Sequence, residues 1–276
     1  MRILFTGHKG FLGRELIPEL EKDFDIRTFD GDLQDFPKLS KFVSTEKIER
    51  VIHAAVRGGR RTHVDTHEDL AENLKTSINA FRLGIPLLSF CSGKVYDWST
   101  GIENRAESAA DSAYPKDFYG QSKHLFRKIS FNEPEVKLVR FFNVFGPSES
   151  SDRFIKANIS RYANNLPMQI HNDLIMDFFY VNDTVPLLKK WILGGDIPKE
   201  INMVYAKKYL LSEVCALINK LDQHQVNIDF NDLNLGKNYF GNGELLLKQG
   251  FKLNGLLLGL EKMYEFVRAN LDQDKF

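Results

Sequence analysis

The chain has 276 residues, of which 43% are hydrophobic and 27% charged, a composition typical of a soluble globular protein with a substantial core. Its 37 basic and 37 acidic residues cancel, which argues against nucleic acid or an anionic membrane as the main partner. Two cysteines, Cys91 and Cys215, are too few for a disulfide framework, and no apolar segment approaches the length of a membrane span. No signal peptide is recognisable either, so we expect a cytoplasmic protein of one domain or two closely joined ones.

The first candidate site lies between a short apolar run at residues 2–5 and the amphipathic helix that follows it. Glycines at positions 7, 10 and 13 have the spacing of the dinucleotide-binding fingerprint. Gly7 allows a tight turn, Gly10 lets the backbone approach a pyrophosphate, and Gly13 lets the helix pack closely on the strand. The helix N-terminus also offers unpaired N–H groups to phosphates. The residues predicted here to bind a cofactor are Gly7, His8, Lys9, Gly10, Phe11, Leu12 and Gly13.

Strand and helix patterns alternate along the first half of the chain. Strands are predicted at residues 26–29, 51–55, 86–91 and 136–142, and helices at 36–43 and 69–83. This alternation indicates parallel strands joined by right-handed crossovers. We therefore predict an α/β fold with a Rossmann-type doubly wound parallel sheet.

After Gly146 the pattern loosens. Helices are predicted at residues 154–164, 210–221 and 256–271, with a strand at 175–181. We expect residues 1–146 to form an NAD(P)-binding domain that also receives elements from about 172–194. Residues 147–276 would form mostly a smaller substrate-binding lobe.

Three polar residues are expected to meet at the carboxyl ends of the strands, where open α/β sheets bind their ligands. Ser92 follows the strand 86–91, while Tyr119 and Lys123 are four residues apart and so share one face of a helix. A phenol titrates near pH 10, so we expect Lys123 and a positively charged nicotinamide ring to lower the pKa of Tyr119. Ser92 would help to polarise a carbonyl. Taken alone, this spacing fits an incidental Tyr and Lys on a surface helix equally well.

Together, the motifs of the chain resemble those of the extended short-chain dehydrogenase/reductase family, the nucleotide-sugar epimerases, dehydratases and 4-reductases. The motifs stand in the family's order and are Thr6–Gly13, Val51–Ala55, Phe90–Tyr96, Tyr119–Lys123, Arg140–Pro147 and Asp177–Asp183.

The resemblance implies that Ser92, Tyr119 and Lys123 form the catalytic triad, and that Tyr119 and Lys123 also contact the cofactor. It further implies dinucleotide contacts from Ala54, Ala55, Val56 and Asn73. Asn143 would face a nucleotide-sugar substrate, and the helices bearing Asn73 and Tyr119 would form a homodimer.

The positions that follow Ser92 favour one branch of this family. The dehydratases carry an Asp-Glu pair there, but this chain has Gly93 and Lys94, so 4,6-dehydration is not expected. The turn Gly7-His-Lys-Gly10 resembles the Gly-His-Arg-Gly of GDP-fucose synthase, and the short link after the second strand is similar to that of dTDP-4-dehydrorhamnose reductase. We therefore favour reduction of a 4-keto sugar with Tyr119 as proton donor. A 4-epimerase and a non-catalytic NADP-binding regulatory subunit are the alternatives.

The cofactor and the substrate contacts are less closely determined. Lys9 could meet a ribose 2′-phosphate, which favours NADP(H), whereas Asp30 could accept a ribose 2′-hydroxyl, which favours NAD(H). We favour NADP(H) because the sequence around Lys9 fits the reductase branch. Met176 stands where many relatives place a diphosphate-binding arginine. The residues predicted to bind the substrate are Ser92, Lys94, Asn143 and Arg57. Further candidates for the diphosphate are Arg60, Arg61, Arg153, Lys156 and Arg161.

Two histidine motifs are assigned no catalytic role. His53 lies within a predicted strand and is interpreted as a core histidine. His63 and His67 are four residues apart with Asp65 between them, but no further ligand group indicates a metal, and no metal site is predicted.

Overall fold

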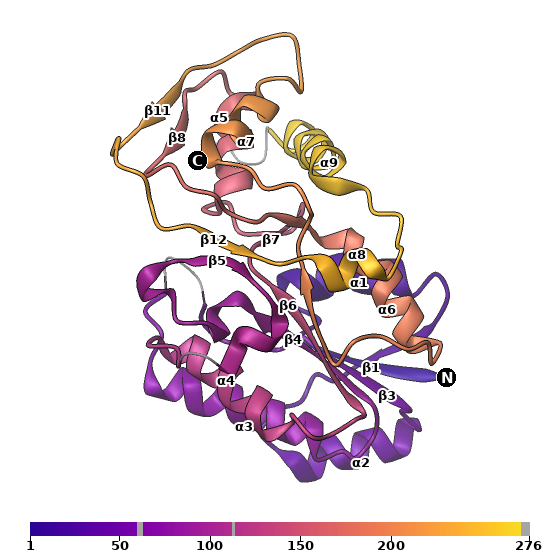
Figure 1. Ribbon diagram of the computed structural model, residues 1–276. Helices are drawn as coiled ribbons and strands as arrows, with labels where there is room; N and C mark the ends of the chain where they lie inside the picture. The colour runs from indigo at the N-terminus through magenta and orange to yellow at the C-terminus, as the bar shows by residue number, and fades with distance from the viewer. Residues whose placement is uncertain (60–62, 112–113, 272–276) are drawn as a thin grey trace.

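A computed structural model describes residues 1–59, 63–111 and 114–271. Its centre is a sheet of six strands, all parallel to their neighbours, which confirms the predicted Rossmann-type fold (Figure 1). In spatial order the strands are β2 (Asp25–Thr28), β1 (Arg2–Thr6), β3 (Arg50–His53), β4 (Leu87–Ser92), β6 (Val136–Phe141) and β10 (Glu200–Met203). The strand order reverses at β1, so a ligand crevice is expected beyond the carboxyl ends of β1 and β3.

The strands are apolar on both faces because helices cover both. Ile3 and Phe5 contribute to one fully buried core cluster and Leu4 to another. Helices α1 (Phe11–Leu20) and α6 (Val185–Ile192) contact each other on one side of the sheet. On the other side lie α2 (Phe36–Glu46), α3 (His67–Phe81) and α4 (Phe118–Ile129), as Figure 1 shows. Burial on both faces is why these strands read as continuous hydrophobic runs in the sequence.

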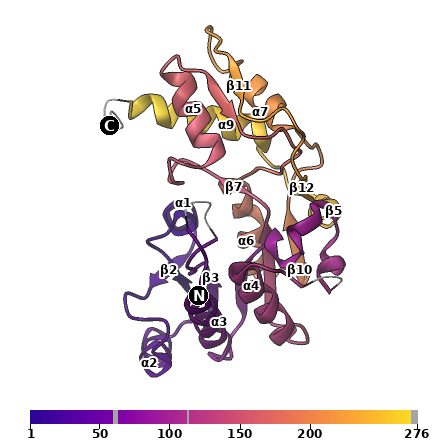
Figure 2. The same cartoon turned by 90° about the vertical axis from the view of Figure 1, so that its left-hand side faces the viewer.

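A smaller lobe lies beyond the carboxyl ends of the strands (Figure 2). Its helices are α5 (Phe154–Ala163), α7 (Leu211–Ile218) and α9 (Gly255–Ala269), with α5 packed on both of the others. Short parallel strand pairs complete it: β8 (Met168–Ile170) with β11 (Ile228–Phe230), and β7 (Val144–Phe145) with β9 (Phe179–Tyr180).

One further strand pair joins the lobe to the sheet domain. Strand β5 (Ile102–Arg105) belongs to the first half of the chain and pairs with β12 (Tyr239–Gly241) from the second half. The short helix α8 (Glu244–Lys248) follows β12 and contacts β10. This pairing brings a C-terminal segment to the edge of the sheet where Ser92 ends β4.

One expectation about the second half differs from the structure. The strand expected at residues 175–181 is limited to β9, because Ile175 and Met176 form only isolated bridges and the backbone N–H groups of Met176 and Asp177 bond the carbonyls of Tyr209 and Tyr239. The segment 172–194 contributes helix α6 beside α1, and the sixth strand of the sheet, β10, follows that segment. Among the described residues, no helix is long and apolar enough to cross a membrane.

Candidate active site

In the turn after β1, two glycine α-carbons have no room for a side chain. Gly7 has a φ of +77°, and a Cβ there would lie 2.6 Å from the backbone nitrogen of Ala55. A Cβ on Gly13 would lie 2.5 Å from the α-carbon of His8. Gly10 precedes α1 in extended conformation with no side-chain cap, so the first N–H groups of α1 keep their capacity to bind an anion. The turn therefore fits the diphosphate of a dinucleotide.

A pocket of about 440 Å³ lies beside this turn and suits the adenosine end of a dinucleotide. It is lined by Gly31, Asp32, Leu33, Gln34, Ala55, Val56, Arg57, Glu72, Asn73 and Thr76. Asn73 fixes its wall, because its side chain accepts from the Arg57 N–H at 2.7 Å and donates to the Arg57 carbonyl at 2.9 Å. The Arg57 guanidinium pairs with Glu72 at 2.6 Å. The structure thus groups Arg57, expected to bind substrate, with the residues expected to bind cofactor.

The two residues expected to decide between NAD(H) and NADP(H) contact each other. The Lys9 ammonium lies 2.8 Å from the Asp30 carboxylate, and Nε2 of His8 lies 3.2 Å from it. The hydrogen bond from Lys9 lowers the pKa of Asp30, so this carboxylate is ionised at neutral pH. Lys9 and Asp30 are both largely exposed, so either can turn toward a ribose.

Helix α4 places Tyr119 and Lys123 beside the end of β4. Asp117 caps the helix by accepting from the Gly120 N–H at 2.8 Å, and a Cβ on Gly120 would lie 2.4 Å from the Lys94 carbonyl oxygen. Glycine at this position therefore lets the helix approach the segment after Ser92. Nζ of Lys123 donates to the Phe90 carbonyl at 3.0 Å and lies 5.8 Å from the centre of the Tyr119 ring. The structure thus brings together the three residues expected to form a triad.

The protein's own side chains do not lower the pKa of Tyr119 as the sequence predicts. Burial is the largest influence and raises this pKa, while interaction with the Ser92 hydroxyl acts in the opposite direction. Burial also lowers the pKa of Lys123. Tyr119 is therefore a neutral phenol with a proton to donate, the form that a reductase needs.

Two of the residues expected to face the substrate lie near this group. Nδ2 of Asn143 is buried without a hydrogen-bond partner in the described part of the chain, so it has a donor available to a ligand. Nζ of Lys94 lies 5.9 Å from the Tyr119 ring centre and 3.5 Å from the Asp117 carboxylate.

Comparisons with known proteins identify the family of the chain. Residues 3–203 match the model of the NAD dependent epimerase/dehydratase family. The chain belongs to this family. It is therefore an enzyme of the extended short-chain dehydrogenase/reductase type, whose members are NAD(P)-dependent nucleotide-sugar epimerases, dehydratases and reductases.

One relative is the GDP-6-deoxy-D-talose 4-dehydrogenase of Aggregatibacter actinomycetemcomitans, 25% identical over 258 residues that cover 84% of each chain. Among solved structures, the GDP-mannoheptose C4 reductase of Campylobacter jejuni with NADP bound superposes with a TM-score of 0.82 at 17% identity, covering 96% of this chain and 97% of the other. The dTDP-glucose 4,6-dehydratase of Bacillus anthracis in complex with NAD gives a TM-score of 0.81 at 15% identity, covering 99% and 98%. These two structures support the fold.

The backbone at Gly59 packs directly on the ring of Tyr119. A Cβ on Gly59 would lie 2.7 Å from Cε2 of Tyr119, so the loop backbone contacts the phenol ring. The loop is fixed by Asp65, which accepts from the Gly59 N–H at 2.7 Å, and by Asp69, which bonds Nε2 of His63 at 2.8 Å. Asp65, Asp69 and His63 offer ligand atoms within 4.8 Å of one another, a grouping that the sequence did not predict. Their hydrogen bonds assign them to holding the loop.

The cations Arg153, Lys156 and Arg161, expected to bind a diphosphate, each donate to a backbone carbonyl. Lys156 donates to the carbonyls of Pro147 and Glu149, and Nε of Arg161 donates to the carbonyl of Pro167. The positive charge of Arg153 acts to lower the pKa of Tyr119, against the larger effect of burial. Arg60 and Arg61, which follow the loop glycines, lie outside the described residues.

A buried glutamate orients Arg153. Oε2 of Glu149 lies 3.1 Å from Nε of Arg153, and Oε1 accepts from the Lys156 N–H at 3.2 Å, inside the first turn of α5. Nη2 of Arg153 donates to the Val144 carbonyl at 3.1 Å. Glu149 was not predicted from the sequence, because a single glutamate in a polar loop carries no pattern.

Tyr239 is the other site residue that the sequence analysis missed. Strand β12 carries it from the lobe to the Ser92 end of β4, where its hydroxyl would be 2.8 Å from a Cβ on Gly93. Its ring meets Trp98 edge-on at 5.8 Å between centroids.

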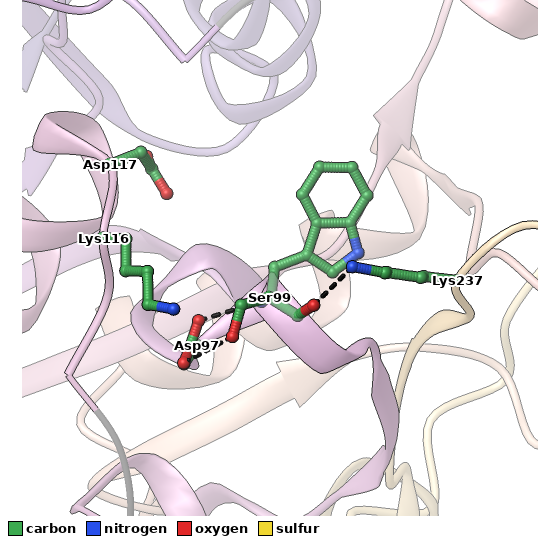
Figure 3. A pocket seen from close by; sticks show the side chains of 6 residues that line it. Asp97, Ser99, Lys116, Asp117 and Lys237 are labelled. Carbon is green, nitrogen blue, oxygen red and sulfur yellow. Dashed lines mark hydrogen bonds between the residues drawn. The ribbon is translucent and has the colours of Figure 1, made fainter.

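Trp98 also lines a second pocket of about 380 Å³, together with Asp97, Ser99, Lys116, Asp117 and Lys237 (Figure 3). The polar groups of this pocket largely bond to one another. The Ser99 N–H and hydroxyl donate to Asp97, and the Lys237 ammonium donates to the Ser99 carbonyl. We assign this pocket no role in the chemistry.

Proposed function

We propose that this enzyme reduces the 4-keto group of a nucleotide-linked sugar, with NADPH as the preferred reductant. The grouping of Ser92, Tyr119 and Lys123 at one end of the sheet carries this proposal, because it supplies what a carbonyl reduction needs. Gly93 and Lys94 stand where the dehydratases carry an acidic pair, which removes the groups that elimination requires. The names of the talose 4-dehydrogenase and of the mannoheptose C4 reductase support chemistry at C4.

The triad would divide the proton chemistry as follows. Tyr119, kept neutral by burial, donates its hydroxyl proton to the carbonyl oxygen as that oxygen gains charge. Ser92 donates a hydrogen bond to the same oxygen and stabilises the developing negative charge. Lys123 lies close enough to stabilise the phenolate that remains, and it would also bond the nicotinamide ribose. When bound, the reduced nicotinamide supplies a hydride to the carbonyl carbon, so that ketone, hydride and proton together give the alcohol.

The glycine turn and the neighbouring pocket would hold the dinucleotide. Gly7 and Gly10 leave the N-terminus of α1 open to the diphosphate, while Ala55, Val56 and Asn73 line the pocket for the adenosine. We infer that Lys9 meets the 2′-phosphate of NADPH after leaving Asp30. His8, Phe11, Leu12 and Ala54 complete the cofactor contacts inferred from the motif.

On the substrate side, Arg153 would take over the role of the arginine that Met176 replaces. Glu149 holds its guanidinium at the first turn of α5, and its charge reaches Tyr119. A guanidinium is suited to two oxygens of a diphosphate at once. Asn143 and Lys94 would contact the sugar. We further infer a cytoplasmic homodimer that associates through α3 and α4, which light scattering of the purified protein would test.

The test is to offer NADPH or NADH to the purified protein with a panel of 4-keto nucleotide sugars and to follow the loss of reduced-nicotinamide absorbance. Consumption of NADPH with one sugar, abolished in Tyr119→Phe, is the expected result. Interconversion of two 4-hydroxy sugars without net consumption, by protein that retains NAD⁺ through purification, would instead establish the 4-epimerase. Cofactor binding without either activity would favour the regulatory subunit.

A further inference from the structure

The lobe supplies a buried phenol to the Ser92 end of β4. Tyr239 is only 6% exposed, and its ring packs against Phe142 at 5.2 Å between centroids. A Cβ on Gly93 would lie 2.8 Å from the Tyr239 hydroxyl oxygen and 2.7 Å from Cδ1 of Phe142. Glycine after Ser92 is therefore what admits this phenol to the active site.

The position of this phenol is set by the segments around it. Tyr239 donates its N–H to the Ile175 carbonyl at 2.8 Å, and β12 pairs with β5. Two residues further on, the Gly241 N–H donates to the buried Asp177 carboxylate at 2.8 Å, and Lys208 bonds the other oxygen of Asp177 at 2.7 Å. A hydroxyl held this firmly can impose an orientation on its neighbour.

The neighbour that it can orient is the Ser92 hydroxyl, because the Tyr239 hydroxyl lies against Gly93, the next residue in the chain. A serine hydroxyl has one proton to donate and two lone pairs. One lone pair already accepts the Lys94 N–H at 3.2 Å. A second donor on Oγ would fill its capacity to accept and would leave its own proton free to point at a substrate oxygen.

We propose that Tyr239 is this second donor, and that it acts as a positioning residue by directing the Ser92 proton toward the carbonyl oxygen that Tyr119 protonates. The inference rests on the proposed function for its catalytic consequence. The contact between Ser92 and Tyr239 can be tested without any substrate.

The test is a double-mutant cycle of Ser92→Ala and Tyr239→Phe, with Tyr162→Phe as the matched control. Tyr162 is equally buried, but its hydroxyl bonds the His224 carbonyl within the lobe. With the sugar that the wild type reduces, Tyr239→Phe is expected to lower kcat by about 10- to 100-fold while KM changes little, as for loss of one oriented donor. In the Ser92→Ala background, Tyr239→Phe should change kcat by less than about 2-fold. Tyr162→Phe should keep the wild-type kcat.

Multiplicative effects of the two substitutions on kcat, or an unchanged kcat in Tyr239→Phe, would overturn the proposal. Thermal unfolding gives a second measurement that needs no substrate, made on the wild type, the two single variants Ser92→Ala and Tyr239→Phe, and their double variant. The decrease in Tm of the double variant should be smaller than the sum of the single decreases, and a plain sum would refute the contact. A wild type inactive on every sugar would count against the proposed function, while the unfolding cycle would still decide the pairing of Ser92 with Tyr239.

Discussion

Replacing Gly7 by alanine should separate the two reasons for which the turn needs glycine. At a φ of +77° any side chain is strained, which costs about 1 kcal/mol. In addition, the new Cβ would lie 2.6 Å, 2.7 Å and 2.8 Å from three backbone atoms of Ala55 and Ala54, none of which can rotate away. Overpacking of this kind costs about 1–3 kcal/mol more. We therefore expect Gly7→Ala to lower the free energy of unfolding by about 2–4 kcal/mol.

The matched control is Gly84→Ala. Gly84 has a φ of +68°, but no atom lies within 4 Å of its added Cβ, so this variant carries the backbone strain without the contact. It should lose only about 1 kcal/mol and keep its affinity for NADPH. Gly7→Ala should also bind NADPH more weakly, because the end of β3 must shift away from the turn. Urea unfolding and cofactor fluorescence titration measure both effects, and equal losses of stability in the two variants would refute the steric part of the reasoning.

Four further substitutions test the charges and the proton donor. Asp30→Asn should strengthen binding of NADPH relative to NADH, and Lys9→Ala should weaken it, because the two charges act oppositely on a 2′-phosphate; parallel titrations of both cofactors decide this. Burial raises the pKa of Glu149 to about 7 from an ordinary 4.5, so the free energy of unfolding should fall as pH rises between these values, by about 3 kcal/mol at most. Glu149→Gln should flatten that slope in urea unfolding at pH 5 and pH 7.5, and an unchanged slope would contradict the assignment. Tyr119→Phe should lower turnover at least about 100-fold with NADPH affinity retained, and near-normal turnover would exclude it as proton donor.

The sheet domain is the part of the fold that could be predicted closely from the sequence. Its strands are buried on both faces and its glycines punctuate each turn, so hydrophobic runs marked β1, β3, β4 and β6 to within two residues at either end. Prediction failed at residues 175–181, where an apolar run forms a strand only at β9. The cause is long-range, since the backbone N–H groups of Met176 and Asp177 bond the carbonyls of Tyr209 and Tyr239, which are distant in the sequence.

In the candidate site too, residues in local sequence patterns could be predicted and residues placed by long-range contacts could not. Ser92, Tyr119 and Lys123 carry a recognisable spacing, and the structure brings them together. Tyr239 and Glu149 stand in segments without periodicity, and their importance arises from contacts made only after folding. The Tyr239 hydroxyl lies against Gly93, which stands far earlier in the chain. In the protein without cofactor, burial raises the pKa of Tyr119, an influence that the sequence does not show beside the nearby lysine.

Two buried carboxylates link the lobe to the active site, and each contributes to function at the expense of stability. Glu149 orients Arg153, and Asp177 holds both Lys208 and the strand that carries Tyr239. Burial raises the pKa of Glu149 to about 7 and that of Asp177 to about 6, so ionising either one costs folding free energy. Their ion pairs nevertheless require the ionised form. Activity should therefore rise with pH over the same range in which the free energy of unfolding falls, a combination expected where a site is built for binding rather than for stability.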